Sequence, residues 1–134
     1  MQVQFYEEIE DQLLKFAVII SKYQNKWVFC KHKLRDTFEI PGGHREENEN
    51  ILETGAIDFK IKPICVYSVI GKNRVNNTGE ELYGMLYYAD IYSFEENLHS
   101  EMEKIVLFNE LPNLWTYPEI QPKLIEYYIN LGNK

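Results

Sequence analysis

One stretch decides how this sequence folds. It runs Ile40-Pro41-Gly42-Gly43-His44-Arg45-Glu46-Glu47-Asn48-Glu49, and Glu53-Thr54-Gly55-Ala56-Ile57 follows shortly after. A strand-like run ends in Pro-Gly-Gly, and a dense acidic segment begins at once. Proline fixes φ and glycine allows backbone that bulkier residues cannot adopt, so we expect a sharp turn with accessible carbonyl oxygens.

This pattern supports two interpretations equally. Carboxylates placed just beyond such a turn are oxygen ligands of the kind that hard divalent cations prefer, which indicates a metal-assisted site at a strand-to-helix junction. An ordinary glycine turn that leads into a solvated acidic helix start fits as well, because acidic first turns complement the helix dipole.

Length and composition predict one globular domain, residues 1–134, with 45% apolar and 26% charged residues. The net charge of −7 argues against binding of a nucleic-acid polymer, whose affinity depends on basic side chains that neutralise phosphates. A small nucleotide that arrives with its magnesium ion remains compatible, because the cation bridges two negative partners. The composition sets no expectation for the oligomeric state.

The cysteines and the hydropathy pattern predict a cytoplasmic protein. Cys30 and Cys65 both lie within strand-like apolar runs, where small buried thiols are favoured over a disulfide and suit a reducing compartment. We identify no signal peptide and no apolar run long enough to span a bilayer, so no membrane partner is expected.

Apolar runs separated by turn residues predict an α+β domain rich in strands. Gln24 and Asn25 have turn chemistry and predict a hairpin between the runs on either side. The strand-like segments are Gln2–Tyr6, Leu13–Tyr23, the run from Trp27, Ile57–Ile70 with an interruption at Pro63, Leu82–Ile91 and Glu101–Phe108.

Two segments are predicted to be helical. Residues 49–54 span only about 9 Å as a helix, so this segment needs tertiary support. Glu49 and Glu53 would share one face there and could share a divalent cation. The second helix begins near Gln121, with an apolar stripe of Leu124, Ile125, Tyr128 and Ile129, and ends at Gly132.

The motifs resemble those of the Nudix (MutT-like) family. Phe38-Glu39-Ile40-Pro41-Gly42-Gly43-His44, Glu49 and Glu53-Thr54-Gly55-Ala56-Ile57 are similar to the two ends of a Nudix box, and Gly43 with Glu49 has its first spacing. Further similarity lies in Tyr83-Gly84-Met85-Leu86-Tyr87 and Phe108-Asn109-Glu110-Leu111-Pro112. The resemblance implies an α/β/α sandwich with a mixed central sheet.

The middle of the box departs from the family pattern. In the family the closing Gly falls twenty-one positions after the first, whereas Gly55 falls twelve after Gly43, so nine residues are absent. The absent part is the Arg-Glu-apolar-x-Glu-Glu core, which carries the main metal ligands in the family. We therefore expect the catalytic helix to be shortened or missing.

The resemblance implies a set of site residues. The backbone carbonyl of Gly42, with Glu49 and Glu53, would hold Mg²⁺ or Mn²⁺, and the two glutamates would take part in catalysis. Glu101 and Glu103 are candidates for the glutamate outside the box that assists as a ligand or base. Lys72 and Arg74 would meet substrate phosphates, although loop cations are mostly solvated. Tyr83 or Tyr87 would stack on a nucleobase, with core packing as the favoured alternative.

The implied function is a Nudix pyrophosphohydrolase, an enzyme acting on acid anhydrides. It would use a divalent metal to cleave a pyrophosphate linkage in nucleoside di- or triphosphate-type substrates, with activity reduced by the shortened box. The alternative is a non-catalytic nucleotide-binding or structural relative that has lost its metal site. A third and weaker alternative is a partner-binding domain with neither nucleotide affinity nor catalysis.

Overall fold

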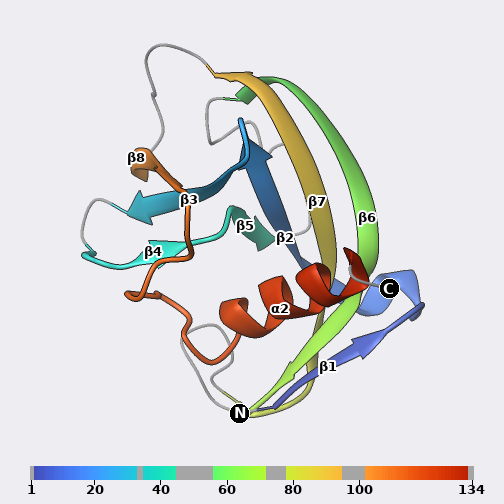
Figure 1. Ribbon diagram of the computed structural model, residues 1–134. Coiled ribbons are helices and arrows are strands. Elements are labelled where there is room, and N and C mark those ends of the chain that lie inside the picture. The colour runs from blue at the N-terminus through green and yellow to red at the C-terminus, as the bar shows by residue number, and fades with distance from the viewer. Residues whose placement is uncertain (1, 33–34, 45–55, 72–77, 95–101, 133–134) are drawn as a thin grey trace.

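The computed structural model describes residues 2–32, 35–44, 56–71, 78–94 and 102–132 (Figure 1). Within these ranges the chain forms strands, one short 3-10 helix and one α-helix. The elements are β1 (Gln2–Tyr6), η1 (Asp11–Leu13), β2 (Leu14–Tyr23), β3 (Lys26–His32), β4 (Phe38–Glu39), β5 (Gly42–His44), β6 (Ala56–Ile70), β7 (Leu82–Phe94), β8 (Met102–Phe108) and α2 (Gln121–Gly132).

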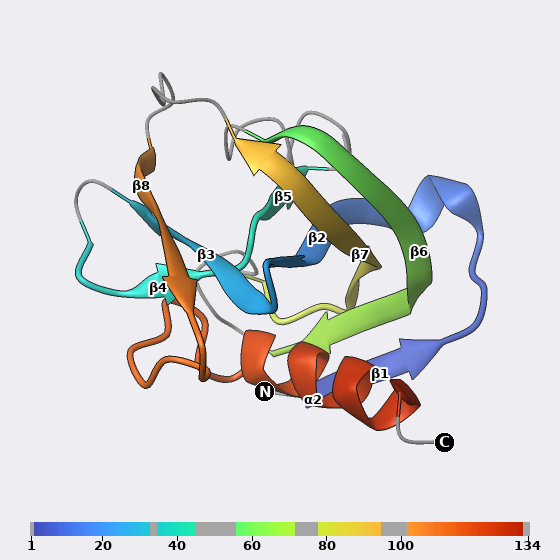
Figure 2. The same ribbon diagram turned by 45° about the horizontal axis from the view of Figure 1, so that its top comes forward.

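The strands form one mixed sheet, as predicted. Its order is β1-β6-β7-β2-β3-β4, with β5 paired to β2 and β8 paired to β3. The β2–β7 pair is parallel, and the other pairs are antiparallel. Figure 2 shows the long strands β6 and β7 curling side by side, so the sheet is strongly bent rather than flat.

Strand β2 is buried on both faces, which explains its uninterrupted apolar sequence. Val18 and Ile20 belong to the core cluster that packs against α2, whereas Ala17 and Ile19 belong to a second cluster on the opposite face. Successive side chains of a strand point to opposite faces, so one strand serves both clusters. The two cysteines, Cys30 and Cys65, are buried and free, as expected.

The predicted hairpin between β2 and β3 is confirmed. Gln24 and Asn25 have φ values of 50° and 64°, which is the left-handed conformation that a two-residue hairpin turn of type I′ requires. The register on either side pairs Lys22 with Trp27 and Tyr23 with Lys26.

The predicted interruption at Pro63 is wrong. Strand β6 runs through this position, and its pairing with β7 shifts register between Pro63 and Cys65. A proline lacks the N–H that a regular ladder needs, and such an irregularity is where a strand tolerates one. The chain therefore keeps a single strand of 15 residues here.

The predicted turn in Pro-Gly-Gly lies at Pro41 and not at the glycines. The chain bends at Pro41, but Gly42 and Gly43 already belong to β5, which pairs antiparallel with β2. The Pro41 carbonyl is not free either, because it accepts a hydrogen bond of 2.8 Å from Ile19 N. Pro-Gly-Gly thus ends one short strand and begins the next.

Helix α2 lies across one face of the sheet, with β1 nearby (Figure 1). Leu124 and Ile125 are buried as predicted, and the rings of Tyr127 and Tyr128 stack on Phe5 and Tyr88 with centroid distances of 4.0 and 4.7 Å. Ile129, placed in the stripe by its spacing, is 39% exposed instead. Among the described helical residues, no segment is long and apolar enough to cross a membrane.

Candidate functional site

A cavity of about 100 Å³ lies between the start of α2 and the sheet. An apolar cavity of about 150 Å³ is known to hold benzene, so this one has the scale of a single flat ring. Its walls are mostly apolar, from residues that come from five strands and from the segment that leads into the helix. They are Phe16, Val18, Glu39, Ile40, Gly42, Tyr67, Val69, Leu82, Tyr117, Ile120 and Gln121.

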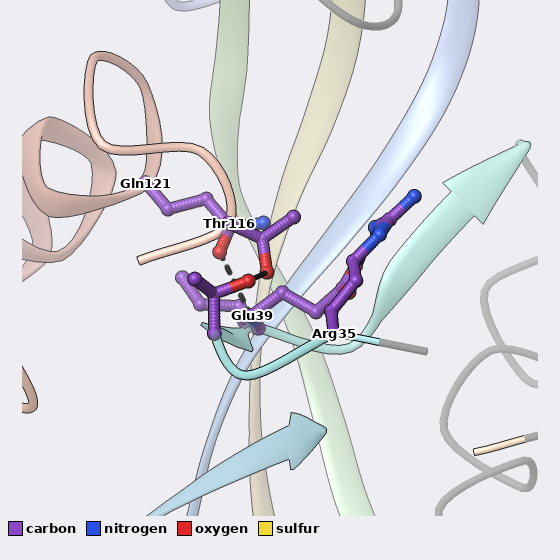
Figure 3. Close-up of polar contacts among 6 residues, drawn as sticks. Arg35, Glu39, Thr116 and Gln121 are labelled. Carbon is purple, nitrogen blue, oxygen red and sulfur yellow. Dashed lines mark hydrogen bonds and ion pairs between the residues drawn. The ribbon is translucent and has the colours of Figure 1, made fainter. Parts of the chain in front are cut away.

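Gln121 is a polar side chain in this apolar wall. It is 5% exposed, and its Oε1 accepts a hydrogen bond of 2.8 Å from Ile40 N (Figure 3). That bond ties the first turn of α2 to the bend at the end of β4. The side chain therefore satisfies a buried backbone donor and lines the cavity at once.

Gly42 lines the cavity from the other side, and it must be glycine because of a close backbone approach. A Cβ at this position would lie 2.7 Å from the carbonyl oxygen of Ala17 and 3.2 Å from Cα of Val18. Both neighbours are in β2, which cannot move without disturbing the sheet. The requirement comes from strand packing and not from a turn.

The register of β5 also sets the direction of the Gly42 carbonyl. Ile19 N donates a hydrogen bond to the Pro41 carbonyl. Hydrogen-bonded and non-hydrogen-bonded pairs alternate along an antiparallel ladder, so the neighbouring pair, Val18 and Gly42, is a non-hydrogen-bonded one. The Gly42 carbonyl accordingly points away from β2. Among the described strands β5 pairs with β2 alone, so this oxygen suits the role of a metal ligand.

Glu39 also lines the cavity, and its carboxylate contacts Arg35, four residues earlier. Arg35 Nη1 lies 3.4 Å from Glu39 Oε1, in a contact that is both a hydrogen bond and an ion pair (Figure 3). The backbone on either side of Phe38 bonds to the segment before α2, through Phe38 N to the Leu114 carbonyl and Thr116 N to the Phe38 carbonyl. These bonds fix β4 against the segment that leads into the helix.

Tyr67 forms part of the cavity wall, and Gly84 makes room for its ring. The two residues are direct partners in the β6–β7 ladder, and a Cβ on Gly84 would lie 2.7 Å from two ring carbons and from the hydroxyl oxygen of Tyr67. Tyr67 is buried, and this burial raises the pKa of its hydroxyl. The hydroxyl thus stays protonated across the physiological range.

Tyr83, predicted to stack on a base, does not line the cavity. Its ring lies 5.9 Å from that of Tyr6, and both hydroxyls bond to the carboxylate of Glu81. Ser68 Oγ donates to the same carboxylate over 2.6 Å. Tyr87, the other stacking candidate, is buried in the second core cluster, as the packing alternative predicted.

Hydrogen bonding shifts the pKa values in this cluster around Glu81. The bonds from Ser68 and Tyr6 hold the pKa of the Glu81 carboxyl below its usual value. The bond to Glu81 raises the pKa of Tyr6 and of Tyr83, because loss of the tyrosine proton would leave two negative groups in contact. Glu81 is therefore ionised and holds the start of β7 against β1 and β6.

Most of the residues predicted for catalysis or substrate binding lie outside the described residues. These are Glu49, Glu53, Lys72, Arg74 and Glu101. Glu103 lies in β8 between Met102 and Lys104, where the pairing with β3 is irregular. Within the described ranges no group of three His, Cys, Asp or Glu side chains could hold a metal ion.

The contribution of Gln121 was not predicted from the sequence. Its position three and four residues before Leu124 and Ile125 places it on the apolar stripe of α2, because 121, 124, 125 and 128 share one helix face. A polar residue on an otherwise apolar helix face is the sequence signal by which Gln121 could have been identified. Ile129 was assigned to the stripe in its place.

Known proteins resemble this chain in structure. A glutamate-to-alanine mutant of the Bacillus subtilis pyrophosphohydrolase BsRppH superimposes with a TM-score of 0.73 and 24% identity, over 97% of this chain and 91% of that one. A NUDIX hydrolase from Nitrosomonas europaea gives 0.65 and 14%, over 87% and 89%. A UDP-X diphosphatase gives 0.60 and 18%, over 90% of this chain and 64% of that one.

No protein-family model and no curated protein sequence matches the chain. The structural matches nevertheless agree with one another, and they establish that the chain has the Nudix fold. The fold resemblance stated from the Pro-Gly-Gly stretch and its neighbours is therefore confirmed.

Proposed function

We propose that this protein is a Nudix-type hydrolase that cleaves a pyrophosphate linkage in nucleoside di- or triphosphate-type substrates with the help of Mg²⁺ or Mn²⁺. The observation that carries the proposal is the position of the cavity. A ring-sized apolar cavity is lined by Gly42, and the acidic segment 46–53 follows only a few residues later. A base in the cavity would bring its phosphates near Gly42, shortly before the acidic segment in the sequence.

The proposed metal site combines one backbone carbonyl with two carboxylates of the segment that follows it. The Gly42 carbonyl points away from β2 and would hold the cation together with Glu49 and Glu53. A divalent cation supplies charge neutralisation at the phosphate oxygens and a more acidic bound water. A polyphosphate and this acidic segment repel each other without such a cation, so the proposal requires a metal.

The chain's own residues would divide the remaining work. The apolar walls of the cavity exclude water from the base and fix the substrate's orientation. Lys72 and Arg74 would contact phosphate oxygens, and Glu101 or Glu103 would accept a proton from the attacking water. Tyr83 would not stack on the base, because its hydroxyl is hydrogen-bonded to Glu81.

The proposal is tested with a panel of nucleoside di- and triphosphates, by the release of phosphate or pyrophosphate with and without magnesium. We expect magnesium-dependent turnover of at least one substrate. Glu49→Gln should lower the rate at least about 100-fold. Loss of a residue that only hydrogen-bonds to a metal ligand costs about 10- to 100-fold, and loss of the ligand itself should cost more. The control, Glu46→Gln, should change the rate little. Equal, small effects would remove Glu49 from the site.

The shortened box favours one alternative, a nucleotide-binding protein without catalysis. It predicts that nucleotides raise the melting temperature equally with magnesium and with a chelator, while no substrate of the panel is hydrolysed. The first proposal predicts turnover, and a nucleoside triphosphate should stabilise the protein more when magnesium is present.

A further inference from the structure

The side-chain amide of Gln121 has a fixed orientation. Ile40 N–H can only donate, so the atom that it contacts at 2.8 Å must be the amide oxygen and the nitrogen must lie on the other side. A free glutamine could turn over and offer either atom to a ligand. This one cannot turn without breaking the bond to Ile40.

The amide nitrogen remains available to the cavity. In the described part of the chain no hydrogen bond from Gln121 Nε2 to a protein atom accompanies the bond at Oε1. No buried side-chain nitrogen or oxygen among the described residues lacks a partner, so Nε2 is not sealed off from a solvent-filled space. Gln121 lines the cavity and its Oε1 is engaged by Ile40 N, so Nε2 is the polar atom that this side chain has left for a ligand there.

We propose that Gln121 is a specificity-determining residue that selects nucleotides whose base carries a carbonyl oxygen on its edge. The proposal deepens the proposed function and rests on it for the class of ligand. The N–H of Nε2 would donate to the base carbonyl, as found at position 6 of guanine and hypoxanthine. Adenine carries an amino group there, which would set donor against donor and leave both groups unpaired.

Apart from Gln121, Glu39 and the tyrosine hydroxyls, the cavity is lined by apolar groups, which suits the faces of a flat ring. Phe16, Val18 and Val69 offer apolar surface from the sheet, and Tyr117 and Ile120 offer it from the helix side. Such walls bind the faces of any base alike, so they cannot distinguish one base from another. Discrimination falls to the few polar groups with a fixed orientation.

The test compares inosine 5′-monophosphate with adenosine 5′-monophosphate, which differ at position 6 in this way. Dissociation constants are measured by titration calorimetry with a chelator present, so that metal binding and hydrolysis play no part. We expect the inosine nucleotide to bind about tenfold tighter, as one neutral hydrogen bond and one avoided mismatch imply.

Gln121→Glu isolates the donor. The new carboxylate still accepts the Ile40 N–H but offers the cavity an acceptor, so the preference should disappear or turn toward adenosine 5′-monophosphate. Gln121→Met, which has no polar group and a similar length, should abolish the preference in either direction. Thr37→Val is the control, because it removes the neighbouring 2.7 Å bond to Thr116 and does not touch the cavity.

The outcomes are distinct. Equal binding of both nucleotides by the unchanged protein, or binding of neither, overturns the proposal. The same preference in Gln121→Glu and Gln121→Met overturns it as well, because another group would then read the base. A preference that depends on Gln121 in a protein with no turnover would support the specificity proposal and refute the hydrolase.

Discussion

Gly42 is the residue at which the packing of the sheet and the candidate site meet. Its missing side chain lets β5 approach β2, and its carbonyl points away from β2. A larger residue would push the strand out and move this oxygen with it. One small residue thus controls both the strand and the proposed metal ligand.

We predict that Gly42→Ala destabilises the protein by about 1–3 kcal/mol, the usual cost of an overpacked core. The added Cβ would meet the Ala17 carbonyl oxygen at 2.7 Å, and a backbone atom in a central strand cannot shift cheaply. Urea unfolding followed by circular dichroism measures the change. Gly132→Ala is the matched control, because nothing lies within 4 Å of its added Cβ. An effect of equal size in both variants would contradict this account.

Glu81 shows how one carboxylate can hold three strands. It accepts hydrogen bonds from Tyr6 in β1 and Ser68 in β6, and it immediately precedes β7. Because these bonds favour the ionised form, the pKa of Glu81 is lower in the folded protein than in the unfolded chain. Its contribution to stability is therefore full above the unfolded pKa of about 4.3 and is lost as the pH falls through the folded pKa.

We expect Glu81→Gln to lower the melting temperature near neutral pH. The difference in melting temperature between the variant and the unchanged protein should shrink as the pH falls below about 4. The reason is that the unchanged protein loses the ionic contribution there, while the variant never has it. Melting curves from pH 3 to pH 7 measure this convergence. Glu126→Gln, on an exposed position of α2, is the control. A difference that is constant across the pH range would contradict the prediction.

At the scale of elements, α2 is joined to the sheet by one face only. Leu124 and Ile125 are buried in the core cluster that also contains residues of β2, β6 and β7. Tyr127 and Tyr128 cover the cluster by stacking on Phe5 and Tyr88. The helix therefore holds one wall of the cavity in place, since Ile120 and Gln121 lie at its start.

Two substitutions in α2 separate the buried face from the exposed one. Leu124→Ala should cost about 2–5 kcal/mol, because Leu124 is fully buried and a cavity would remain. Ile129→Ala should cost less than about 1 kcal/mol, because its side chain is 39% exposed. Chemical unfolding of both variants checks the difference. Comparable losses would mean that the stripe extends to Ile129, as its spacing first indicated.

The β6–β7 pair controls the cavity from the opposite side. Tyr67 leans over its partner Gly84, and this position leaves the ring at the cavity wall. The two residues lie in different strands, so the sequence around either one does not predict this pairing.

We predict that Gly84→Ala displaces the Tyr67 ring, because the new Cβ would lie 2.7 Å from it. Stability should fall by about 1–3 kcal/mol, and nucleotide binding should weaken because the ring enters the cavity. The double variant Gly84→Ala with Tyr67→Ala removes the clash and should bind more tightly than the single variant. Calorimetric titration measures both effects. Additive effects of the two substitutions would show that the side chains are independent.

The whole molecule buries both of its cysteines in one sheet. Burial raises the pKa of Cys65 to about 11, so its reactive thiolate is scarce at pH 8. We expect neither thiol to react with a disulfide reagent in the native protein, and both to react at the rate of global unfolding. The reaction is followed by absorbance across a urea series. Fast labelling of either cysteine without denaturant would show that the sheet opens locally.

Much of this molecule is determined by sequence alone, because the relevant signals are local. Alternation and apolar runs placed β1, β2, β7 and β8 within a few residues of their observed bounds, and Gln24-Asn25 predicted the hairpin. The order of strands and helices indicated an α+β domain, and the Pro-Gly-Gly stretch with the other family motifs indicated the Nudix fold. Tolerance of Pro63 within β6 was missed, since a register shift depends on the partner strand.

The candidate site is largely decided by tertiary structure. Gln121 becomes a fixed donor only because Ile40, eighty-one positions earlier, supplies the N–H that orients it. Gly42 is required because β2 lies against it. Tyr83 does not take its predicted place beside a base, because its hydroxyl bonds to Glu81. Periodicity describes which face a residue occupies, whereas these roles depend on which distant residue stands opposite. The sequence determined the fold, and long-range packing chose the residues that surround the cavity.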